Sequence, residues 1–219
     1  ITMIVDERMT TFINSLDAGN TPFLNQIEEE AIKTNVPIIR TDMQSFMKFL
    51  LAASQPMQIL EVGAAIGFSA LLMSTYAPEG CHITTIENYE KRIPIARENI
   101  ARAGKEKEIT LLEGDAQEIL PTLNESYDLI FMDAAKGQYL AFLPEVLRLL
   151  KPGGLLVSDN VLQDGDIIES RYAVIRRNRT IHSRMRDYLY ELKHHPELTT
   201  AILPVGDGVA VCTKRSLPG

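Results

Sequence analysis

The segment QILEVGAAIGFSALLMSTYA, residues 58–77, joins a short apolar run to a longer one through a loop that contains Gly63 and Gly67. The first run is rich in β-forming residues and ends at a glycine, which predicts a buried strand, and the run after Gly67 predicts a helix. A dinucleotide-binding loop carries a further glycine between these two, where the backbone approaches a pyrophosphate. Ala65 occupies that position, so the loop argues against NAD as the ligand.

Strand and helix continue to alternate after this segment. The pattern predicts strands near 82–87, 109–116, 127–134 and 154–162, with helices between them. Continuous apolar strands separated by helices indicate a parallel sheet that is covered on both faces. The C-terminal stretch 199–214 differs, because it predicts two strands joined by Gly206-Asp207-Gly208, a hairpin signal. We therefore predict a doubly wound, mostly parallel α/β sheet that ends in an antiparallel hairpin.

This layout resembles the Rossmann-like fold of the class I methyltransferases. We predict a single domain over residues 1–219, in which helices at about 3–54 precede the Rossmann-like core. Thr21-Pro22 has the pattern of a helix start.

The composition sets limits on the class of protein. Hydrophobic residues make up 45% of the chain and charged residues 23%, which is ordinary for a soluble globular domain. The formal net charge is −7, so the chain as a whole is not a polybasic nucleic-acid binder, although a local basic patch remains possible. The two cysteines form no CxxC pair, and no apolar run is as long as a membrane span. We expect a cytoplasmic protein that does not bind membranes.

Acidic and amide side chains stand where the predicted strands end. Asp133 follows one strand, and the pair Asp159-Asn160 follows another. Ligands of doubly wound sheets lie beyond the carboxyl ends of the strands, and neighbouring strands are only about 5 Å apart. Two carboxylates and one amide oxygen suit a hard cation such as Mg²⁺. The alternative interpretation is that these acids merely cap the following turns or helices.

These residues, together with the E-x-G-x-x-x-G pattern that starts at Glu61, resemble the cation-dependent O-methyltransferases. That family contains the catechol and caffeoyl-CoA O-methyltransferases, and the resemblance runs from about residue 36 to 215. It implies S-adenosylmethionine (SAM) as methyl donor, bound by Ile39, Glu61, Gly63, Ser69, Glu87, Asp115, Ala116 and Asp133. It also implies a divalent metal on Asp133, Asp159 and Asn160, and catalytic roles for Asp133 and Lys136.

The implied chemistry is physically coherent. A metal that chelates two neighbouring oxygens of the acceptor stabilises the deprotonated one, which then attacks the methyl group. Lys136 could take the proton, because a lysine that is buried near a cation gives up its own proton more easily. A solvated surface lysine is the alternative.

Several segments indicate which acceptor is used. Four of them resemble the bacterial branch of the family that converts 5-hydroxyuridine to 5-methoxyuridine at the wobble position of tRNA. They are VPII (36–39), DAAKGQY (133–139), SDNVLQDG (158–165) and the tail 195–214. The two neighbouring oxygens of that base could chelate a metal as a catechol does. This implies the tRNA anticodon loop as partner, whereas a small catechol-like or phenolic acceptor is the alternative function. A SAM- or RNA-binding module without activity would have no need of the metal-binding residues.

A basic stretch gives weaker support for RNA. We call residues 171–186 the arginine segment; it holds six arginines and no acid, namely Arg171, Arg176, Arg177, Arg179, Arg184 and Arg186. These could hold anticodon phosphates, and Tyr139 or Tyr172 could stack on a splayed base. A solvated face or a dimer contact would also explain the segment. The resemblance further implies a homodimer, with N-terminal helices such as 3–33 as contacts.

Overall fold

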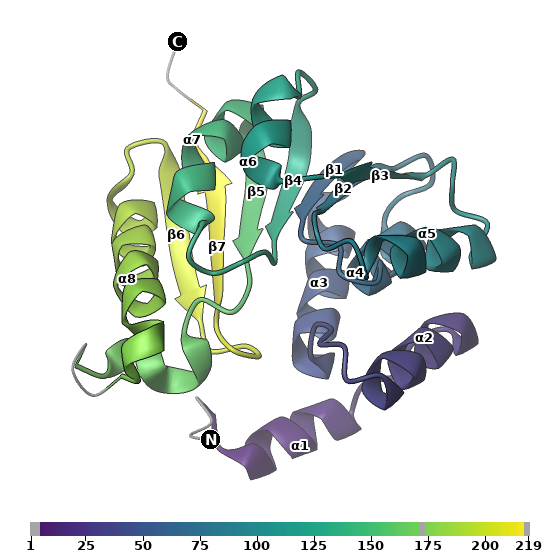
Figure 1. Cartoon of the computed structure of the whole chain (residues 1–219), viewed down its shortest axis with the longest axis horizontal. Coiled ribbons are helices and arrows are strands. Elements are labelled where there is room, and N and C mark those ends of the chain that lie inside the picture. The colour runs from purple at the N-terminus through teal and green to yellow at the C-terminus, as the bar shows by residue number, and fades with distance from the viewer. Residues whose placement is uncertain (1–4, 171–173, 217–219) are drawn as a thin grey trace.

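The computed structural model describes residues 5–170 and 174–216, and its centre is one seven-stranded sheet (Figure 1). The strands are β1 (Gln58–Val62), β2 (His82–Glu87), β3 (Ile109–Glu113), β4 (Tyr127–Met132), β5 (Leu150–Ser158), β6 (Leu198–Leu203) and β7 (Val209–Lys214). Their order is β3-β2-β1-β4-β5-β7-β6. The first five are parallel to one another, and β7 pairs antiparallel with both β5 and β6. The predicted parallel sheet with a closing hairpin is confirmed.

Each central strand sends alternate side chains to two separate cores. In β4, Leu129 and Phe131 belong to one buried cluster, whereas Ile130 and Met132 belong to the other. This alternation is a consequence of the period of two in a strand, and it explains why the strands read as continuous apolar runs. Both faces of the sheet are therefore covered by helices.

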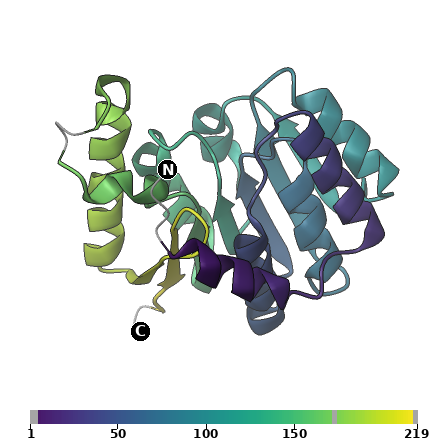
Figure 2. The ribbon, with the colours of Figure 1, turned by 90° about the horizontal axis from the view of Figure 1, so that it is seen from below.

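Two sets of helices provide that cover, one on each side of the sheet (Figures 1 and 2). One face packs against α2 (Pro22–Lys33), α3 (Thr41–Ser54), α4 (Phe68–Tyr76) and α5 (Ile93–Arg102). The other face packs against α6 (Ala116–Ile119), α7 (Tyr139–Leu149) and α8 (Arg179–His194). Short 3₁₀ helices lie at Leu120–Thr122 (η1), Gln163–Ile168 (η2) and Arg176–Asn178 (η3).

Helices α1 (Glu7–Ser15), α2 and α3 precede β1 in the chain. The hydroxyl of Thr21 accepts the N–H of Leu24 at 3.4 Å, and Pro22 is the first residue of α2, so the predicted helix start is confirmed. Helix α1 buries none of its residues. In Figure 1 it lies below the sheet, and it contacts α3.

One strand begins earlier than the sequence indicates. We predicted a strand from 154 to 162, but β5 begins at Leu150 and ends at Ser158. The pairing of β4 with β5 is irregular between Tyr127 and Leu129. A Cβ on Gly154 would lie only 2.8 Å from the Leu150 side chain. The glycine thus permits a locally irregular strand, and does not end the element.

Within the two described ranges, no helix is both long enough and apolar enough to cross a membrane.

Candidate active site

The residues that follow the strands lie along one edge of the sheet, where the parallel strands β1 to β5 end. The N–H of Asp133 donates to the carbonyl of Val62, and the N–H of Asp159 donates to the carbonyl of Met132, both at 2.9 Å. The backbones of β1, β4 and β5 therefore stay paired for one residue beyond the strands. This pairing brings Asp133 and Asp159 to neighbouring positions.

A cavity of about 340 Å³ lies beyond the ends of β1 to β4, and we call it the cofactor cavity. Five of the predicted cofactor residues line it: Gly63, Glu87, Asp115, Ala116 and Asp133. The backbone fixes the Glu87 carboxylate, because Oε2 accepts the N–H of Ala65 at 2.6 Å and Oε1 accepts the N–H of Tyr89 at 2.8 Å. Apolar atoms of Ile86 and Phe142 complete the wall. Such a wall suits a ligand with a polar sugar and a flat ring.

The other predicted cofactor residues do not line this cavity; they are Ile39, Glu61 and Ser69. Glu61 is fully buried, and the hydroxyl of Thr85 donates to its Oε2 at 2.5 Å. Its Oε1 has no well-aligned donor among the described residues. Burial raises the pKa of Glu61 to about 7, although the hydroxyls of Ser69 and Thr85 favour the charged form. Ser69 is the second residue of α4 and is 7% exposed. The cofactor roles of these residues remain predictions.

Gly63 is required by the protein's own backbone. Its φ of +105° lies where side chains are rarely found, and a Cβ there would stand 2.3 Å from the carbonyl oxygen of Asp133. Glycine is needed here because the chain after β1 passes directly against Asp133, the residue that follows β4.

Asp133, Asp159 and Asn160 form the group predicted to bind metal. The amide nitrogen of Asn160 donates to Oδ1 of Asp133 at 2.9 Å, and its backbone N–H donates to Oδ1 of Asp159 at 2.7 Å. Burial, then the neighbouring carboxylates of Asp159 and Glu61, raise the pKa of Asp133 well above its usual value. Burial also raises the pKa of Asp159 to about 6, although the charge of Lys136 opposes this shift. Two acids thus share a buried place where a positive charge would stabilise both.

The group differs from a site built from three ionisable ligands. Among the described residues, no three side chains of His, Cys, Asp or Glu are arranged to hold a metal ion. The predicted set contains two carboxylates and an amide, so the amide has to supply the third oxygen. Oxygen ligands of this kind suit Mg²⁺, which usually keeps several waters.

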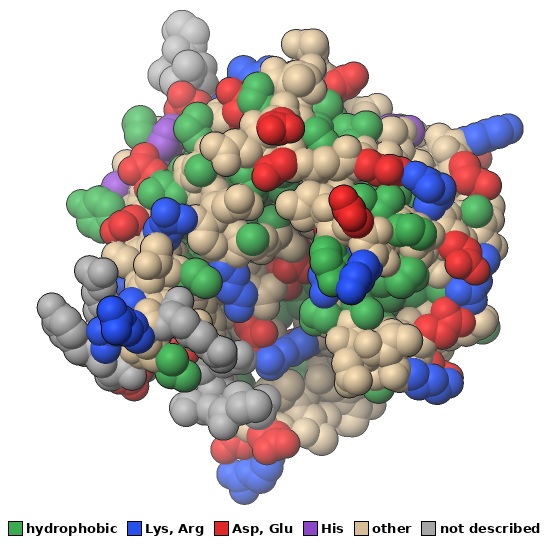
Figure 3. Space-filling model, viewed as in Figure 1, with side chains coloured by type: hydrophobic (Ala, Val, Ile, Leu, Met, Phe, Trp, Pro, Cys, Tyr) green, Lys and Arg blue, Asp and Glu red, His purple; other side chains and the backbone are tan. Residues whose placement is uncertain are grey.

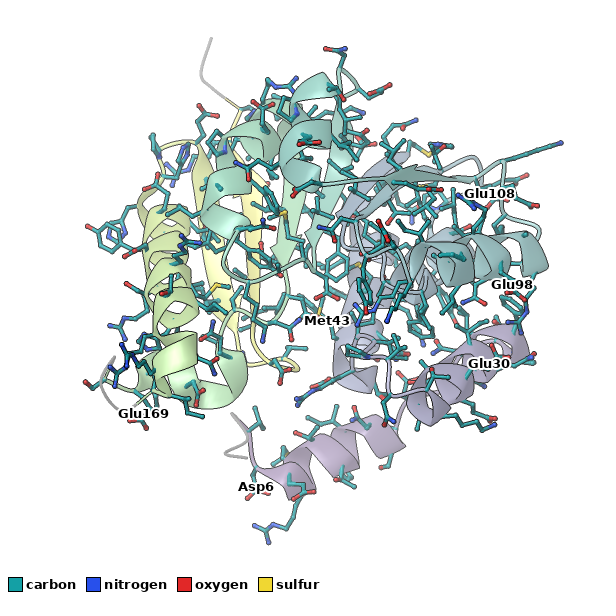
Figure 4. The ribbon with its side chains drawn as sticks, viewed as in Figure 1. Asp6, Glu30, Met43, Glu98, Glu108 and Glu169 are labelled. Atoms are coloured by element: carbon teal, nitrogen blue, oxygen red, sulfur yellow. The ribbon has the colours of Figure 1, made fainter. Side chains whose placement is uncertain are left out.

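A second cavity of about 440 Å³ adjoins the first, and we call it the acceptor cavity. Asp133, Asp159, Asn160, Lys136 and Ile39 line it, together with Met43 of α3, which Figure 4 labels. The two cavities share four lining residues, which are Ala65, Arg92, Asp133 and Ala134. The space-filling view shows a hollow near the middle of the molecule with acidic and basic side chains at its edge (Figure 3). A small group in one cavity can therefore meet a second ligand beside Asp133.

Comparison with known families identifies the chain. Residues 14–215 match the model of a family described as O-methyltransferase. The chain belongs to this family. It is therefore an O-methyltransferase, and the prediction of an enzyme of this class is confirmed.

Individual relatives of this O-methyltransferase agree with the family match. It is 32% identical to a catechol O-methyltransferase of Mycobacterium tuberculosis over 214 residues, which is 93% of this chain and 94% of the relative. It is 36% identical to a catechol O-methyltransferase of Niastella koreensis over 128 residues. That match spans 57% of this chain and only 58% of the relative.

Solved structures show the same fold. A Staphylococcus aureus protein provisionally described as a caffeoyl-CoA O-methyltransferase superposes with a TM-score of 0.88 at 31% identity, and the match covers 95% of this chain and all of that one. A Podospora anserina methyltransferase with S-adenosylhomocysteine (SAH) bound gives a TM-score of 0.86 at 26% identity, over 96% of this chain and 95% of that one. The predicted methyltransferase fold is confirmed.

The arginine segment of the O-methyltransferase lies partly beside the acceptor cavity. Arg184 donates from Nη1 to the carbonyl of Gly137 at 3.2 Å, which places this part of α8 next to the loop that carries Lys136. Arg179 donates to the carbonyl of Val174 at 3.3 Å, and Arg186 donates to that of Ile167 at 2.9 Å. Arg176 is exposed in η3, which also contains Arg177. Arg171 and Tyr172 lie outside the described residues. The RNA-binding role of the segment remains a prediction.

The suggestion that Tyr139 stacks on a base is wrong for this structure. Tyr139 is fully buried, and its hydroxyl lies 3.2 Å from the carbonyl oxygens of both Met132 and Asp159. Its ring packs edge-on against the ring of Tyr188, with 5.4 Å between the two ring centroids. Tyr139 therefore ties the end of β4 to the end of β5, beneath the two acids, and leaves no face for a base.

Sequence reasoning missed two basic residues that line the acceptor cavity of the O-methyltransferase, Arg40 and Arg92. Neither belongs to a motif, and Arg92 follows Glu90 and Lys91 in a short stretch of mixed charge that indicates no particular site. Arg40 directly follows the segment VPII that we singled out for its resemblance, and that position was the only available signal.

Proposed function

We propose that this O-methyltransferase transfers a methyl group from SAM to the O5 oxygen of 5-hydroxyuridine at the wobble position of tRNA, and that it requires a divalent cation. The observation that carries the proposal is the junction of the two cavities at Asp133, beside Asp159 and Lys136. SAM fits the cofactor cavity, because Glu87 offers a carboxylate for ribose hydroxyls and Asp115 stands further along the same wall. The SAH-bound relative supports this assignment.

The donor set fits a divalent cation. Asp133 and Asp159 repel one another, and both have a raised pKa, so a bound cation would relieve an unfavourable pairing. Asn160 directs its amide nitrogen at Asp133 in this structure, and it would serve as a ligand with the amide turned the other way. The chemistry that a cation supplies here is stabilisation of an acceptor oxygen that has lost its proton.

The remaining catalytic work falls to positioning by the protein. Asp133 borders both cavities and fixes the place where donor and acceptor meet. Tyr139 holds the strand ends that carry Asp133 and Asp159. Lys136 lines the acceptor cavity, and we propose that it takes the proton from the acceptor oxygen.

RNA as the acceptor is supported by the resemblance of VPII, DAAKGQY, SDNVLQDG and the tail to the tRNA-modifying branch. The charges around the cavity support it as well. Arg40, Arg92 and Lys136 line the acceptor cavity of a chain whose net charge is −7, and Arg184 stands at the neighbouring loop. The same cavity is lined by three acids, Asp133, Asp159 and Asp207, of which the first two belong to the proposed metal site, so the basic groups would meet the phosphates of a polyanionic substrate.

A small catechol-like acceptor is the second candidate, and the names of the relatives favour it, since they are catechol and caffeoyl-CoA enzymes. A single ring with two neighbouring hydroxyls would fit a cavity of about 440 Å³.

One assay compares the two candidates. The purified protein is given SAM, Mg²⁺ and either an anticodon stem-loop that carries 5-hydroxyuridine or free catechol, and the products are quantified by mass spectrometry. We expect kcat/KM for the stem-loop to exceed that for catechol by at least a hundredfold, and EDTA to abolish the reaction. Methylation of catechol alone would refute the RNA proposal and leave the small-molecule function.

We also propose a homodimer in which a second copy covers α1. The nine-residue helix exposes Met9, Phe12, Ile13 and the following Leu16, each at more than half of its surface. A helix this short that buries nothing is marginal in water on its own. Light scattering should give twice the mass of the chain, and the double variant F12S/L16S should be monomeric. A wild-type monomer at all concentrations would contradict the proposal.

A further inference from the structure

The acceptor cavity has two guanidinium groups on different walls. Arg92 lies on the wall that the acceptor cavity shares with the cofactor cavity, whereas Arg40 lies beside Gly206 and Asp207 of the loop between β6 and β7. We infer that Arg40 and Arg92 bind the phosphates that flank the methylated nucleotide, so that they select a polynucleotide over a free nucleoside or phenol. This inference rests on the RNA acceptor of the proposed function, and it assigns the contacts to residues outside the arginine segment.

Arg40 is held in place by the hairpin loop. Its Nη2 contacts Oδ1 of Asp207 at 2.6 Å, and the side chain of Asp207 is mostly buried whereas that of Arg40 is 46% exposed. A guanidinium has five N–H groups, so it can hold a carboxylate and a phosphate at the same time. Arg40 is thus oriented by a buried acid while it still reaches solvent.

The same loop is joined to the predicted metal ligands. The N–H of Val161 donates to the carbonyl of Gly208, and the N–H of Leu162 donates to that of Asp207, both at 3.0 Å. These bonds bind the loop to the chain that follows Asp159 and Asn160. Arg40 therefore has a fixed place relative to the reacting end of the acceptor.

Arg92 differs in that it forms no ion pair with any residue in the described ranges. Its guanidinium lies over the ring of Tyr89, at 5.3 Å from the ring centroid, at the start of α5. Stacking on an aromatic ring orients an arginine without neutralising its charge. An arginine that borders the cavity, is oriented, and has no acidic partner within those ranges is suited to an anion that the substrate brings.

A catechol provides no anion for these two groups, whereas a nucleotide within a chain has a phosphate on each side. Arginine binds phosphate through paired, charge-assisted hydrogen bonds. Each phosphate contact releases counterions from the RNA, so its loss changes the dependence of binding on salt.

The test uses Arg92→Gln and Arg40→Gln, with Arg97→Gln as the matched control. Arg97 lies on α5, which begins directly after its N-cap residue Arg92, and it pairs with Glu113 and lines neither cavity. Each protein is assayed with the 5-hydroxyuridine stem-loop and with free 5-hydroxyuridine, and the Kd for the stem-loop is measured across salt concentrations. Asp207→Asn is added because it keeps the charge of Arg40 but loosens its position.

For Arg92→Gln and Arg40→Gln we expect KM for the stem-loop to rise about tenfold, with KM for SAM and activity on the free nucleoside within twofold of wild type. The slope of log Kd against log salt should fall in magnitude by about 0.7 to 1 for each arginine. Asp207→Asn should show a smaller rise in KM and an unchanged slope, and Arg97→Gln should match wild type.

Three results would overturn the inference. Equal losses of activity on the stem-loop and on the nucleoside would indicate a structural role for the arginine. A raised KM for SAM alone would assign Arg92 to the cofactor. An unchanged slope of log Kd against log salt would exclude phosphate contacts. The wild-type protein tests the proposed function separately. If it methylates catechol but not the stem-loop, then the RNA acceptor itself is wrong, and the inference falls with it.

Discussion

Replacing Gly63 with alanine tests the packing that positions Asp133. The Cβ that this substitution adds would stand 2.3 Å from the carbonyl oxygen of Asp133, and Cβ contacts below 3.0 Å are essentially never found. Either the loop after β1 or Asp133, the residue that follows β4, must therefore move by at least 0.7 Å, the difference between these two distances. Both segments border the two cavities.

The magnitude follows from the two costs involved. A side chain at positive φ costs about 1–2 kcal/mol, and an overpacked contact costs about 1–3 kcal/mol. Together they predict that the free energy of unfolding falls by about 2–5 kcal/mol, which corresponds to a fall in Tm of about 10 °C for a chain of this size. A displacement near 1 Å at a reacting centre lowers rates by up to about a hundredfold. We expect kcat/KM to fall between tenfold and a hundredfold at a temperature where the variant is folded.

Gly104→Ala is the matched control. Gly104 also has a positive φ, of +66°, but no heavy atom lies within 4 Å of the place that a Cβ would take there. Backbone strain should lower the free energy of unfolding of this variant by only about 1–2 kcal/mol, and the variant should keep full activity. The measurements are thermal unfolding followed by circular dichroism, and initial rates with the stem-loop. If Gly63→Ala and Gly104→Ala behaved alike in both assays, the close contact with Asp133 would have no consequence and the reasoning would be refuted.

Three further predictions concern the buried polar groups. Tyr139→Phe leaves the carbonyls of Met132 and Asp159 without the hydroxyl that donates to both. The free energy of unfolding in urea should fall by about 1–3 kcal/mol, and activity should need more Mg²⁺. Unchanged values of both would contradict the role of this hydroxyl. Glu61 has a pKa of about 7 in the folded protein against an ordinary 4.5, so the native state holds a proton that the unfolded state releases between these values. Wild-type stability should therefore fall by up to about 3 kcal/mol as pH rises from 4.5 to 7, whereas Glu61→Gln should lack this fall in denaturant titrations at each pH; parallel curves would exclude the shift. Saturating Mg²⁺, at about a hundred times its Kd, should stabilise wild type by about 2.7 kcal/mol in thermal unfolding but leave Asp133→Asn unchanged, and equal gains would place the metal elsewhere.

The sequence was sufficient to predict the sheet and the edge at which ligands bind. Apolar runs that end in Gly63, Glu87, Asp133 or Asp159 locate the strand ends, and parallel strands must present those ends together. The predicted convergence of Asp133, Asp159 and Asn160 is therefore found in the structure. These predictions succeed because strand period and connection rules act over short stretches of chain.

Other features depend on contacts between distant segments, which no local pattern records. Gly63 is fixed by the backbone of Asp133, about seventy residues later, and Tyr139 is buried because Tyr188 of α8 packs against it. Arg40 enters the cavity through its pairing with Asp207, at the far end of the chain. A single arginine beside a helix has no periodicity or spacing that would distinguish it before the fold is known.

The most direct test of the central claim is nucleoside mass spectrometry of total tRNA from a strain that lacks this gene. The strain is complemented with the wild-type gene or with one that encodes Asp133→Ala. We predict that 5-methoxyuridine disappears and 5-hydroxyuridine accumulates in the deletion strain, and that only the wild-type gene reverses both changes. Unchanged 5-methoxyuridine without accumulation of 5-hydroxyuridine, in a strain with no second enzyme for this step, would contradict the account.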